Sequence, residues 1–226
     1  MKIRIQFEKL GTIRFTSHKD VLRMFERAFA AAGVPVAWSE GFHPHMRMSF
    51  GPPLRTGWES HEEFMDVTLE GSDPAVMERF AEWVNAKLPE GMRVTRVVAI
   101  DERTPKLASD MSAVALEVSI AADDATTDAG AVSSLISSKF LNTTKPETEP
   151  WVREANVVQS TDALRIRYTS TMQNGRIVTP EDVVSATIGD PDSFRVPIKV
   201  VRLAQYVARG DRLVSPLDEG VVQAAI

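Results

Sequence analysis

Apolar and polar residues alternate at the start of the chain, where Ile3, Ile5 and Phe7 fall on one side of an extended backbone. A period of two is typical of a half-buried β-strand. Apolar residues then recur at helical spacing over about 18–32, directly after the capping-box sequence SHKD at 17–20. The chain is therefore expected to begin with a strand followed by a helix.

The remaining patterns predict the same order of elements in both halves of the chain. In the first half we expect strands at 34–39, 64–69 and 92–100, with a helix from Asp73-Pro74 between the last two. In the second half we expect strands at 114–120, 151–158, 164–171 and 194–203, and helices at 129–141 and 179–188. This order predicts an α+β fold of two tandem ferredoxin-like (βαββαβ) halves with antiparallel sheets. The expected domains are 1–104 and 105–203, with a C-terminal tail at 204–226.

Cysteine is absent from the 226 residues. Its absence excludes disulfides, thiolate zinc sites and a self-contained iron–sulfur cluster, because all of these need cysteine sulfur. No apolar run reaches the roughly 18 residues of a membrane span, and the first residues lack the apolar block of a signal peptide. We therefore expect a soluble, cytoplasmic protein.

The net charge of −5 is unevenly distributed along the chain. Residues 1–56 carry nine Lys or Arg and four Asp or Glu, a net charge of +5, whereas the rest of the chain carries −10. Lys19, Arg23 and Arg27 recur every four residues on the expected outer face of the first helix, and we call them the basic stripe. The asymmetry favours an anionic partner such as nucleic acid, although chance clustering of surface charge gives the same pattern.

All four histidines, including His18 and His61, lie between residues 18 and 61. His43 and His45 flank a proline that biases the backbone toward an extended form, so both side chains are expected on the same side. Such a pair suits contact with a phosphate or a metal ion. Because two histidines are too few for a zinc site by themselves, we assign no metal site. Ligand contact and a structural role remain as alternatives.

The segment at 38–53, WSEGFHPHMRMSFGPP, mixes Gly, Pro, His, Arg and aromatic residues without a period. Loops of this composition usually hold a fixed shape near a ligand. Arg47 offers a bidentate fork to an anion, and Phe42 or Phe50 offers a ring on which a base can stack. In the alternative interpretation, the side chains at 46, 48 and 50 alternate into the core, while those at 45 and 47 face solvent.

Three blocks of this region resemble a known family: RFTSHKD at 14–20, GVPVAWSEGFHPH at 33–45 and MSFGPPL at 48–54. They are similar to the patterns RF-x-SH-x-D, G-x-P-x-x-x-S-x-GF-N/H-P-x and SF-x-P-x-LP-x-G-x-E-S of the radical-SAM-linked domain family of unknown function. Gly57, Glu59 and Ser60 fit the end of the third pattern, whereas Arg55-Thr56 replaces its apolar-proline entry. The resemblance covers about residues 1–70.

The resemblance implies a stand-alone accessory chain. Members of that family occur as separate chains or fused behind a radical SAM enzyme, and they are often encoded near an RNA-processing ribonuclease and ribosomal proteins. The partner radical SAM enzyme would carry the iron–sulfur cluster and S-adenosylmethionine, since this chain has no cysteine to hold a cluster. No cofactor is therefore expected in this chain.

Three functions are compatible with these observations. The first is an RNA-binding or substrate-presenting accessory to a radical SAM enzyme in RNA modification or processing. The second is an enzyme acting on RNA or on a phosphorylated small molecule, with histidines as acid–base groups and arginines as an anion clamp, which requires these residues to meet in one cavity. The third is a structural protein-interaction domain. No catalytic residue is assigned. The candidate ligand-binding residues are Arg14, Ser17, His18, Asp20, Ser39, Gly41, Phe42, His43, His45, Arg47 and Ser49.

Overall fold

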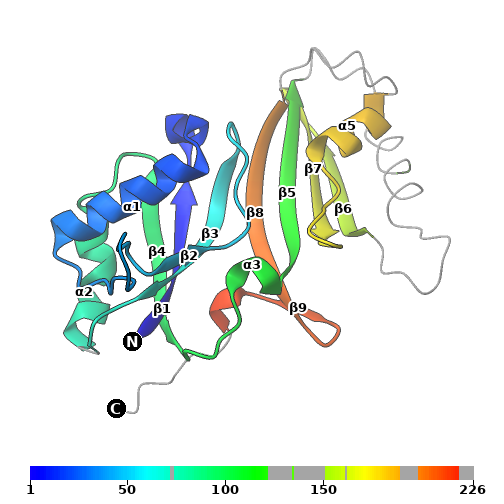
Figure 1. Ribbon diagram of the computed structural model, residues 1–226. Coiled ribbons are helices and arrows are strands. Elements are labelled where there is room, and N and C mark those ends of the chain that lie inside the picture. The colour runs from blue at the N-terminus through cyan, green and yellow to red at the C-terminus, as the bar shows by residue number, and fades with distance from the viewer. Residues whose placement is uncertain (72–73, 122–133, 135–150, 161, 189–197, 219–226) are drawn as a thin grey trace. The chain divides into compact units, whose positions relative to one another are not determined.

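The computed structural model describes residues 1–71, 74–121, 134, 151–160, 162–188 and 198–218, and it shows a mixed α+β fold (Figure 1). The chain divides into two compact units. The first unit comprises Met1–Met111 together with the segment from Val207 onward, and the second comprises Ser112–Tyr206. Within the described ranges, no helix has the length and hydrophobicity that a membrane crossing requires.

An antiparallel sheet forms the centre of the first unit. Strand β1 (Lys2–Lys9) lies between β4 (Met92–Ile100) and β3 (Glu59–Thr68), and the short strand β2 (Met48–Phe50) pairs with β3. The strand order in this unit is therefore β4-β1-β3-β2. The helices α1 (His18–Ala32) and α2 (Pro74–Asn85) lie beside one another against this sheet (Figure 1).

The hydrophobic core of the first unit fills the space between the two helices and β1. Ile3, Ile5 and Phe7 are fully buried there, as their alternation in the sequence predicts. The ring of Phe7 meets that of Phe25 from α1 edge-on, with a centroid distance of 4.8 Å. Phe80 of α2 completes the cluster by packing against α1. Helix α1 thus buries its apolar stripe, which leaves its opposite face to solvent.

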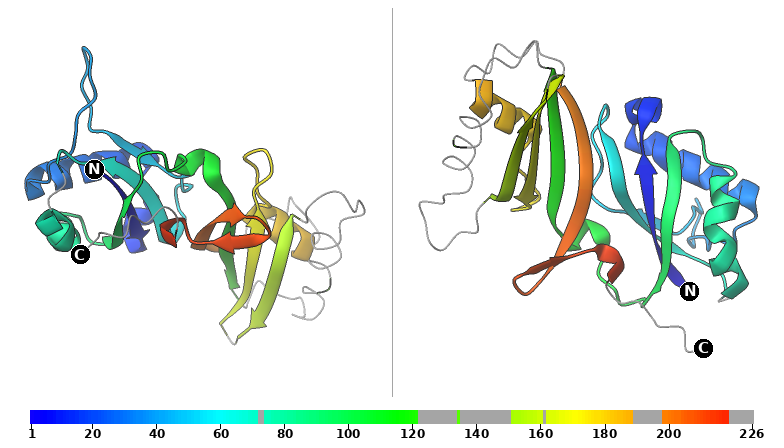
Figure 2. Two further views of the ribbon diagram at one scale, coloured as in Figure 1. Left: turned by 90° about the horizontal axis from the view of Figure 1, so that it is seen from below. Right: turned by 180° about the vertical axis from the view of Figure 1, so that it is seen from behind.

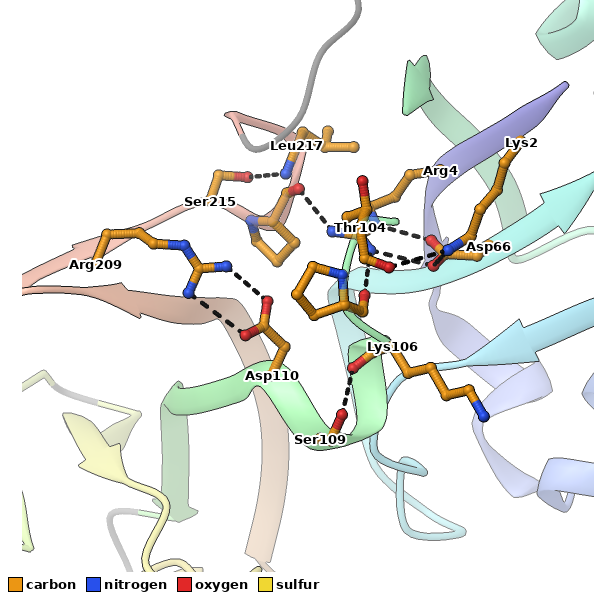
Figure 3. A network of polar contacts seen from close by, with 12 residues as sticks. Lys2, Arg4, Asp66, Thr104, Lys106, Ser109, Asp110, Arg209, Ser215 and Leu217 are labelled. Atoms are coloured by element: carbon orange, nitrogen blue, oxygen red, sulfur yellow. Dashed lines mark hydrogen bonds and ion pairs between the residues drawn. The ribbon is translucent and has the colours of Figure 1, made fainter. Parts of the chain in front are cut away.

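The other face of β1 is also buried, which the alternating pattern does not predict. Arg4 is fully buried on this face, and its guanidinium forms a bidentate pair with Asp66 of β3, with an Nε–Oδ1 distance of 2.7 Å. The same guanidinium donates to the backbone carbonyls of Pro105 and Pro216 at 3.3 and 3.0 Å (Figure 3). Segments remote in the sequence therefore cover the polar side of the strand.

The residues after Ala204 differ from the expected tail. Strand β8 (Ile198–Arg209) begins in the second unit, and its last three residues belong to the first. A hairpin leads into β9 (Arg212–Val214), and the 3-10 helix η5 (Pro216–Asp218) follows. Arg209 also forms an ion pair with Asp110, which ends the short helix α3 (Leu107–Asp110), with an Nη2–Oδ2 distance of 2.8 Å (Figure 3). These contacts make residues 207–218 part of the first unit.

The second unit contains a sheet with the order β8-β5-β7-β6. Strands β5 (Met111–Ala121) and β6 (Val152–Gln159) both pair antiparallel with β7 (Ala163–Thr171). Helix α5 (Pro180–Ile188) begins at the expected proline. The helix expected at 129–141 lies, apart from position 134, outside the described residues, as does the start of the strand expected at 194–203.

In the first half of the chain, the largest difference between the expected and the observed elements is at 34–39, where a strand was expected. This segment makes only two isolated bridges, from Val36 to Leu69 and from Trp38 to Met46. The paired strand that precedes β3 lies instead at β2. Prolines at 35 and 44 and a glycine at 41 interrupt a regular ladder here, because proline lacks the N–H group that a ladder needs.

Candidate functional site

The first sequence block, RFTSHKD, forms the start of helix α1. Ser17 is the N-cap residue, and its Oγ accepts a hydrogen bond from the Asp20 N–H at 3.2 Å. The Asp20 carboxylate in turn accepts hydrogen bonds from the Ser17 hydroxyl at 2.6 Å and from the Ser17 N–H at 3.0 Å. These bonds, led by that of the hydroxyl, lower the pKa of Asp20. The two residues therefore satisfy one another as a capping box.

Arg14 connects this block to the end of the third one. Its Nη1 donates to Oε1 of Glu59 at 3.1 Å, and the same oxygen accepts the N–H of Gly11 at 3.2 Å. Glu59 is buried at the start of β3. The Gly57 N–H also donates to the Arg14 carbonyl at 2.8 Å. The two blocks, separated by about 40 residues, thus hold the short 3-10 helix η1 (Gly11–Phe15) against β3.

Lys9 is a buried residue of this region that the sequence analysis did not select. Its ammonium donates to the carbonyls of Arg14 and Thr16 at 3.3 and 2.9 Å, which terminates η1. Burial lowers the pKa of Lys9, although the charges of Glu63 and Asp20 oppose that shift. Nothing in the local sequence around Lys9 indicates that its amine will be buried against backbone carbonyls.

His18 packs beside this cluster. Its ring meets the ring of Phe50 edge-on at a centroid distance of 5.1 Å. Both rings line a pocket of about 20 Å³, together with Lys9, Glu63 and the Gly51-Pro52-Pro53 turn. That volume holds about one water molecule, whereas ligand sites measure about 300–1,000 Å³. The residues that make these contacts form what we call the motif cluster: Lys9, Arg14, Ser17, His18, Asp20, Phe50 and Glu59. Their contacts build a scaffold, and the pocket beside them is too small for a nucleotide or a metabolite.

The second block forms a projecting hairpin over residues 38–46, which we call the arm. The Ser39 N–H donates to the His45 carbonyl at 2.8 Å, and the Ser39 Oγ accepts the His45 N–H at 3.1 Å and lies 2.9 Å from His45 Nδ1. Gly41 provides the turn with a positive φ of 113°. In the left view of Figure 2, the arm is the narrow blue loop that extends away from the rest of the first unit.

The structure separates the two phenylalanines that were candidates for base stacking. Phe50 packs against Phe7 and Phe25 with centroid distances of 6.2 Å, so it belongs to the core. Phe42 in the arm is 102 % exposed. Met46 is buried, and both His45 and Arg47 are exposed. Residues 45–50 therefore follow the interpretation in which alternate side chains enter the core. The exposed ring of Phe42 fits the other interpretation, in which this segment contacts a ligand.

The histidines do not meet in one cavity. The arm starts beside the end of β3 that pairs with Lys2, because the Ala37 N–H donates to the Thr68 carbonyl at 2.8 Å. His18 lies in the pocket with Lys9, at the other end of β1. In the described part of the chain, no contact joins His18 to His43 or His45. The convergence that the enzyme hypothesis requires is thus not found among the described residues.

The basic stripe lies on the exposed face of α1. Lys19, Arg23 and Arg27 are all exposed, and none forms an ion pair within the described ranges. Arg47 and Ser49 are also exposed at the foot of the arm. Among the described residues, no group of three or more His, Asp or Glu side chains gathers as a metal site would require.

Comparison with protein families gives one result that covers most of the chain. The family model described as "Uncharacterized protein conserved in bacteria (DUF2344)" matches residues 2–186. A comparison with curated proteins found no match. The family match includes the capping box of α1, the arm and the motif cluster, and it continues into α5 of the second unit. Because it spans well over half of the 226 residues, the chain belongs to the DUF2344 family of uncharacterized proteins conserved in bacteria.

Proposed function

We propose that this chain is an RNA-binding accessory module that presents RNA to a radical SAM enzyme on another chain. The observation that carries the proposal is the basic stripe. Lys19, Arg23 and Arg27 lie on one face of a capped helix, about 6 Å apart along its axis, and are exposed. None forms an ion pair in the described ranges, and the charge of Arg23 only helps to lower the pKa of the nearby Asp20. A row of unpaired cations on a rigid element suits the phosphates of a nucleic-acid backbone.

The overall charge distribution supports the same surface. The net charge of +5 over residues 1–56 belongs to the first unit, while the remainder of the chain carries −10. The other residues of the first unit bring its net charge to −2, against −3 for the second unit, so the positive charge is local to the segment that carries α1 and the arm. This local excess of positive charge attracts an anionic ligand to that segment. The partner enzyme enters the proposal through the sequence resemblance, and the lack of cysteine agrees with a cluster held on a different chain.

Both units are proposed to be ferredoxin-like. The strands of the first unit, taken in chain order as one to four, lie in the order 4-1-3-2, and those of the second unit lie in the same order. In many proteins of this topology the open sheet face binds single-stranded RNA through aromatic residues. Here the matching face of the first unit carries the buried Arg4–Asp66 pair, so we assign RNA binding to α1 instead.

The sheet of the second unit offers a groove of about 420 Å³, but its charges do not favour RNA. The guanidinium of Arg167 donates from Nε to Oε2 of Glu117 at 2.5 Å. The Glu154 carboxylate, which accepts the Thr169 hydroxyl at 2.9 Å, adds a negative charge to the groove. A phosphate backbone would meet a neutralised arginine and a carboxylate there, which supports α1 as the binding surface.

The test is RNA binding as a function of salt concentration. We expect tRNA and rRNA fragments to bind, with an affinity that falls steeply between about 50 and 200 mM salt. Replacing all three stripe residues with Gln removes three phosphate contacts, so the slope of log K against log salt should fall by roughly 2 for single-stranded RNA. Fluorescence anisotropy measures both quantities.

A matched control replaces three other exposed cations, Lys87, Arg93 and Arg96, with Gln. This variant has the same net charge as the stripe variant but leaves α1 intact, so its salt slope should stay near that of the wild type. Equal losses in the two variants would show that only net charge matters. Absence of salt-dependent binding by the wild type would refute the proposal. Co-purification from the native host tests the radical SAM partner separately.

A further inference from the structure

The most exposed large apolar side chain among the described residues is Phe42, at 102 %. It occupies the arm, the hairpin of residues 38–46, next to the turn glycine Gly41. A phenylalanine in this setting contributes nothing to the folding core, and an exposed ring on a projecting hairpin has both faces free to stack. Neither the scaffold contacts of the motif cluster nor the basic stripe explains it.

The arm holds this ring on an ordered support. At its foot, the Trp38–Met46 bridge closes the hairpin, and Met46 is buried in the core. Above that bridge, Ser39 binds the His45 backbone and ring through its backbone N–H and its Oγ. Because these contacts exist in the free chain, less conformational entropy is lost when a ligand binds to the arm.

A cation stands beside the arm. The backbone of Arg47 is fixed on both sides, since its N–H donates to the Ala37 carbonyl at 2.8 Å and its carbonyl accepts the Thr68 N–H at 3.0 Å. Its guanidinium is exposed and has no hydrogen bond or ion pair within the described ranges. The arm thus presents an exposed ring beside its turn and a free guanidinium at its foot, and aromatic rings combined with cations bind single-stranded nucleic acid through base stacking and phosphate contact.

We infer that the arm recognises an unpaired RNA base, which stacks on Phe42 while Arg47 at the foot of the arm contacts a phosphate of the same strand. The inference rests on the proposed RNA binding and narrows its substrate class to RNA with a single-stranded loop or end. A base within a duplex is already paired and stacked on both faces, so it offers no free surface to the ring. The basic stripe contributes the affinity that does not depend on pairing, and the arm contributes the preference for unpaired bases.

The experiment compares two RNA probes of equal length, a hairpin with an unpaired loop and a fully paired duplex. Phe42→Ala should weaken binding of the loop RNA by roughly 5- to 150-fold, which corresponds to the loss of one stacking aromatic. Binding of the duplex should not change. The salt slope for the loop RNA should also stay the same, because Phe42 carries no charge. Phe42→Trp should retain the loop preference, and Phe15→Ala, which removes a 62 % exposed ring outside the arm, should have no effect.

The outcomes separate this inference from the proposed function. If the wild type binds RNA through the stripe but Phe42→Ala leaves the loop preference intact, the inference is overturned and the proposed function stands. Equal losses on loop and duplex would also overturn it, because stacking requires an unpaired base. If Phe42→Ala instead abolishes only the capture of a protein partner, the arm is a protein-docking element and the inference is wrong. Failure of the wild type to bind either probe would refute the proposed function itself.

Discussion

A single buried charge pair connects three remote parts of the first unit. Arg4 and Asp66 are 0 % and 2 % exposed, and they face one another across the β1–β3 ladder. Lys2 adds a third charge, with its ammonium 3.4 Å from Asp66 Oδ2. The remaining N–H groups of Arg4 bind backbone carbonyls in the two segments that cover the sheet. Every charge of the cluster therefore has a partner, which is the condition for ions to be tolerated in an interior.

We predict that Asp66→Asn will lower the free energy of unfolding by about 3–5 kcal/mol, because it leaves the buried guanidinium of Arg4 without its counter-charge. The double variant Arg4→Met/Asp66→Leu should be much less destabilised than Asp66→Asn, since it removes both charges together. Urea unfolding followed by circular dichroism measures these values.

The control for this prediction is the exposed ion pair between Arg79 and Glu82, with an Nε–Oε2 distance of 3.6 Å. Both side chains are more than half exposed, so Glu82→Gln should change stability by less than about 1 kcal/mol. A loss in Asp66→Asn no greater than that in Glu82→Gln would contradict the account of the buried pair.

At the scale of elements, local sequence signals were sufficient to predict α1 and β4. Features that depend on contacts between remote segments could not be predicted from such signals. Helix α1 begins after Ser17 and ends before Gly33 because its cap, apolar stripe and terminating glycine all lie within the segment itself. The burial of Arg4 depends on Asp66, Pro105 and Pro216, which no local pattern connects to it.

The candidate site shows the same division. The composition of 38–53 predicted a fixed loop, and the arm is one. Whether Phe42 or Phe50 would be exposed depended on the pairing of β2 with β3, which places Phe50 opposite Met65. Ser17 and Asp20 were selected as candidate ligand groups from their motif, yet their hydrogen-bonding capacity is used on one another. A sequence motif indicates that its residues work together. It does not indicate whether they bind a ligand or stabilise the fold.

We predict that Ser17→Ala will destabilise the first unit by about 0.5–2 kcal/mol through loss of the cap. The substitution should also change how the stability of the first unit depends on pH in acid. The folded pKa of Asp20 lies below its ordinary value of 3.8, so the contribution of its ionised form is present above that value and is lost as the pH falls through the lower folded pKa. Without the Ser17 hydroxyl, the pKa of Asp20 should rise toward the ordinary value. Carboxyl NMR titration of Asp20 checks the shift.

A matched capping box at α5 provides the control. There the Asp182 carboxylate accepts the Thr179 hydroxyl at 2.7 Å and the Thr179 N–H at 2.8 Å. Thr179→Ala should destabilise the second unit and leave the Asp20 titration as in the wild type. An unchanged Asp20 pKa in Ser17→Ala would show that the hydroxyl is not the main cause of the shift.

At the scale of the whole molecule, the second unit is an insertion in the first. The chain leaves the first unit after Met111 and returns to it at Val207. The returning segment supplies the Pro216 carbonyl to Arg4 and buries Leu217, which is 1 % exposed. The first unit is therefore completed by residues that follow the whole second unit in the sequence, and a fragment that ends at Met111 lacks them.

We predict that ending the chain after Gly210 will destabilise the first unit while leaving the second unit unchanged. The truncation removes a hydrogen bond to a charged, buried guanidinium, which contributes about 1.5–3 kcal/mol, and the burial of Leu217, which contributes about 1.5–3 kcal/mol. Amide hydrogen exchange should therefore accelerate in β1 and β3, whereas β6 and β7 should keep the protection they have in the full chain. A chain ending after Asp218 retains every contact of the returning segment described above, so it should exchange like the full chain. Equal protection of β1 in the two truncated chains would mean that the returning segment does not stabilise the first unit, and the buried Arg4 would then have to be held by Asp66 and Pro105 alone.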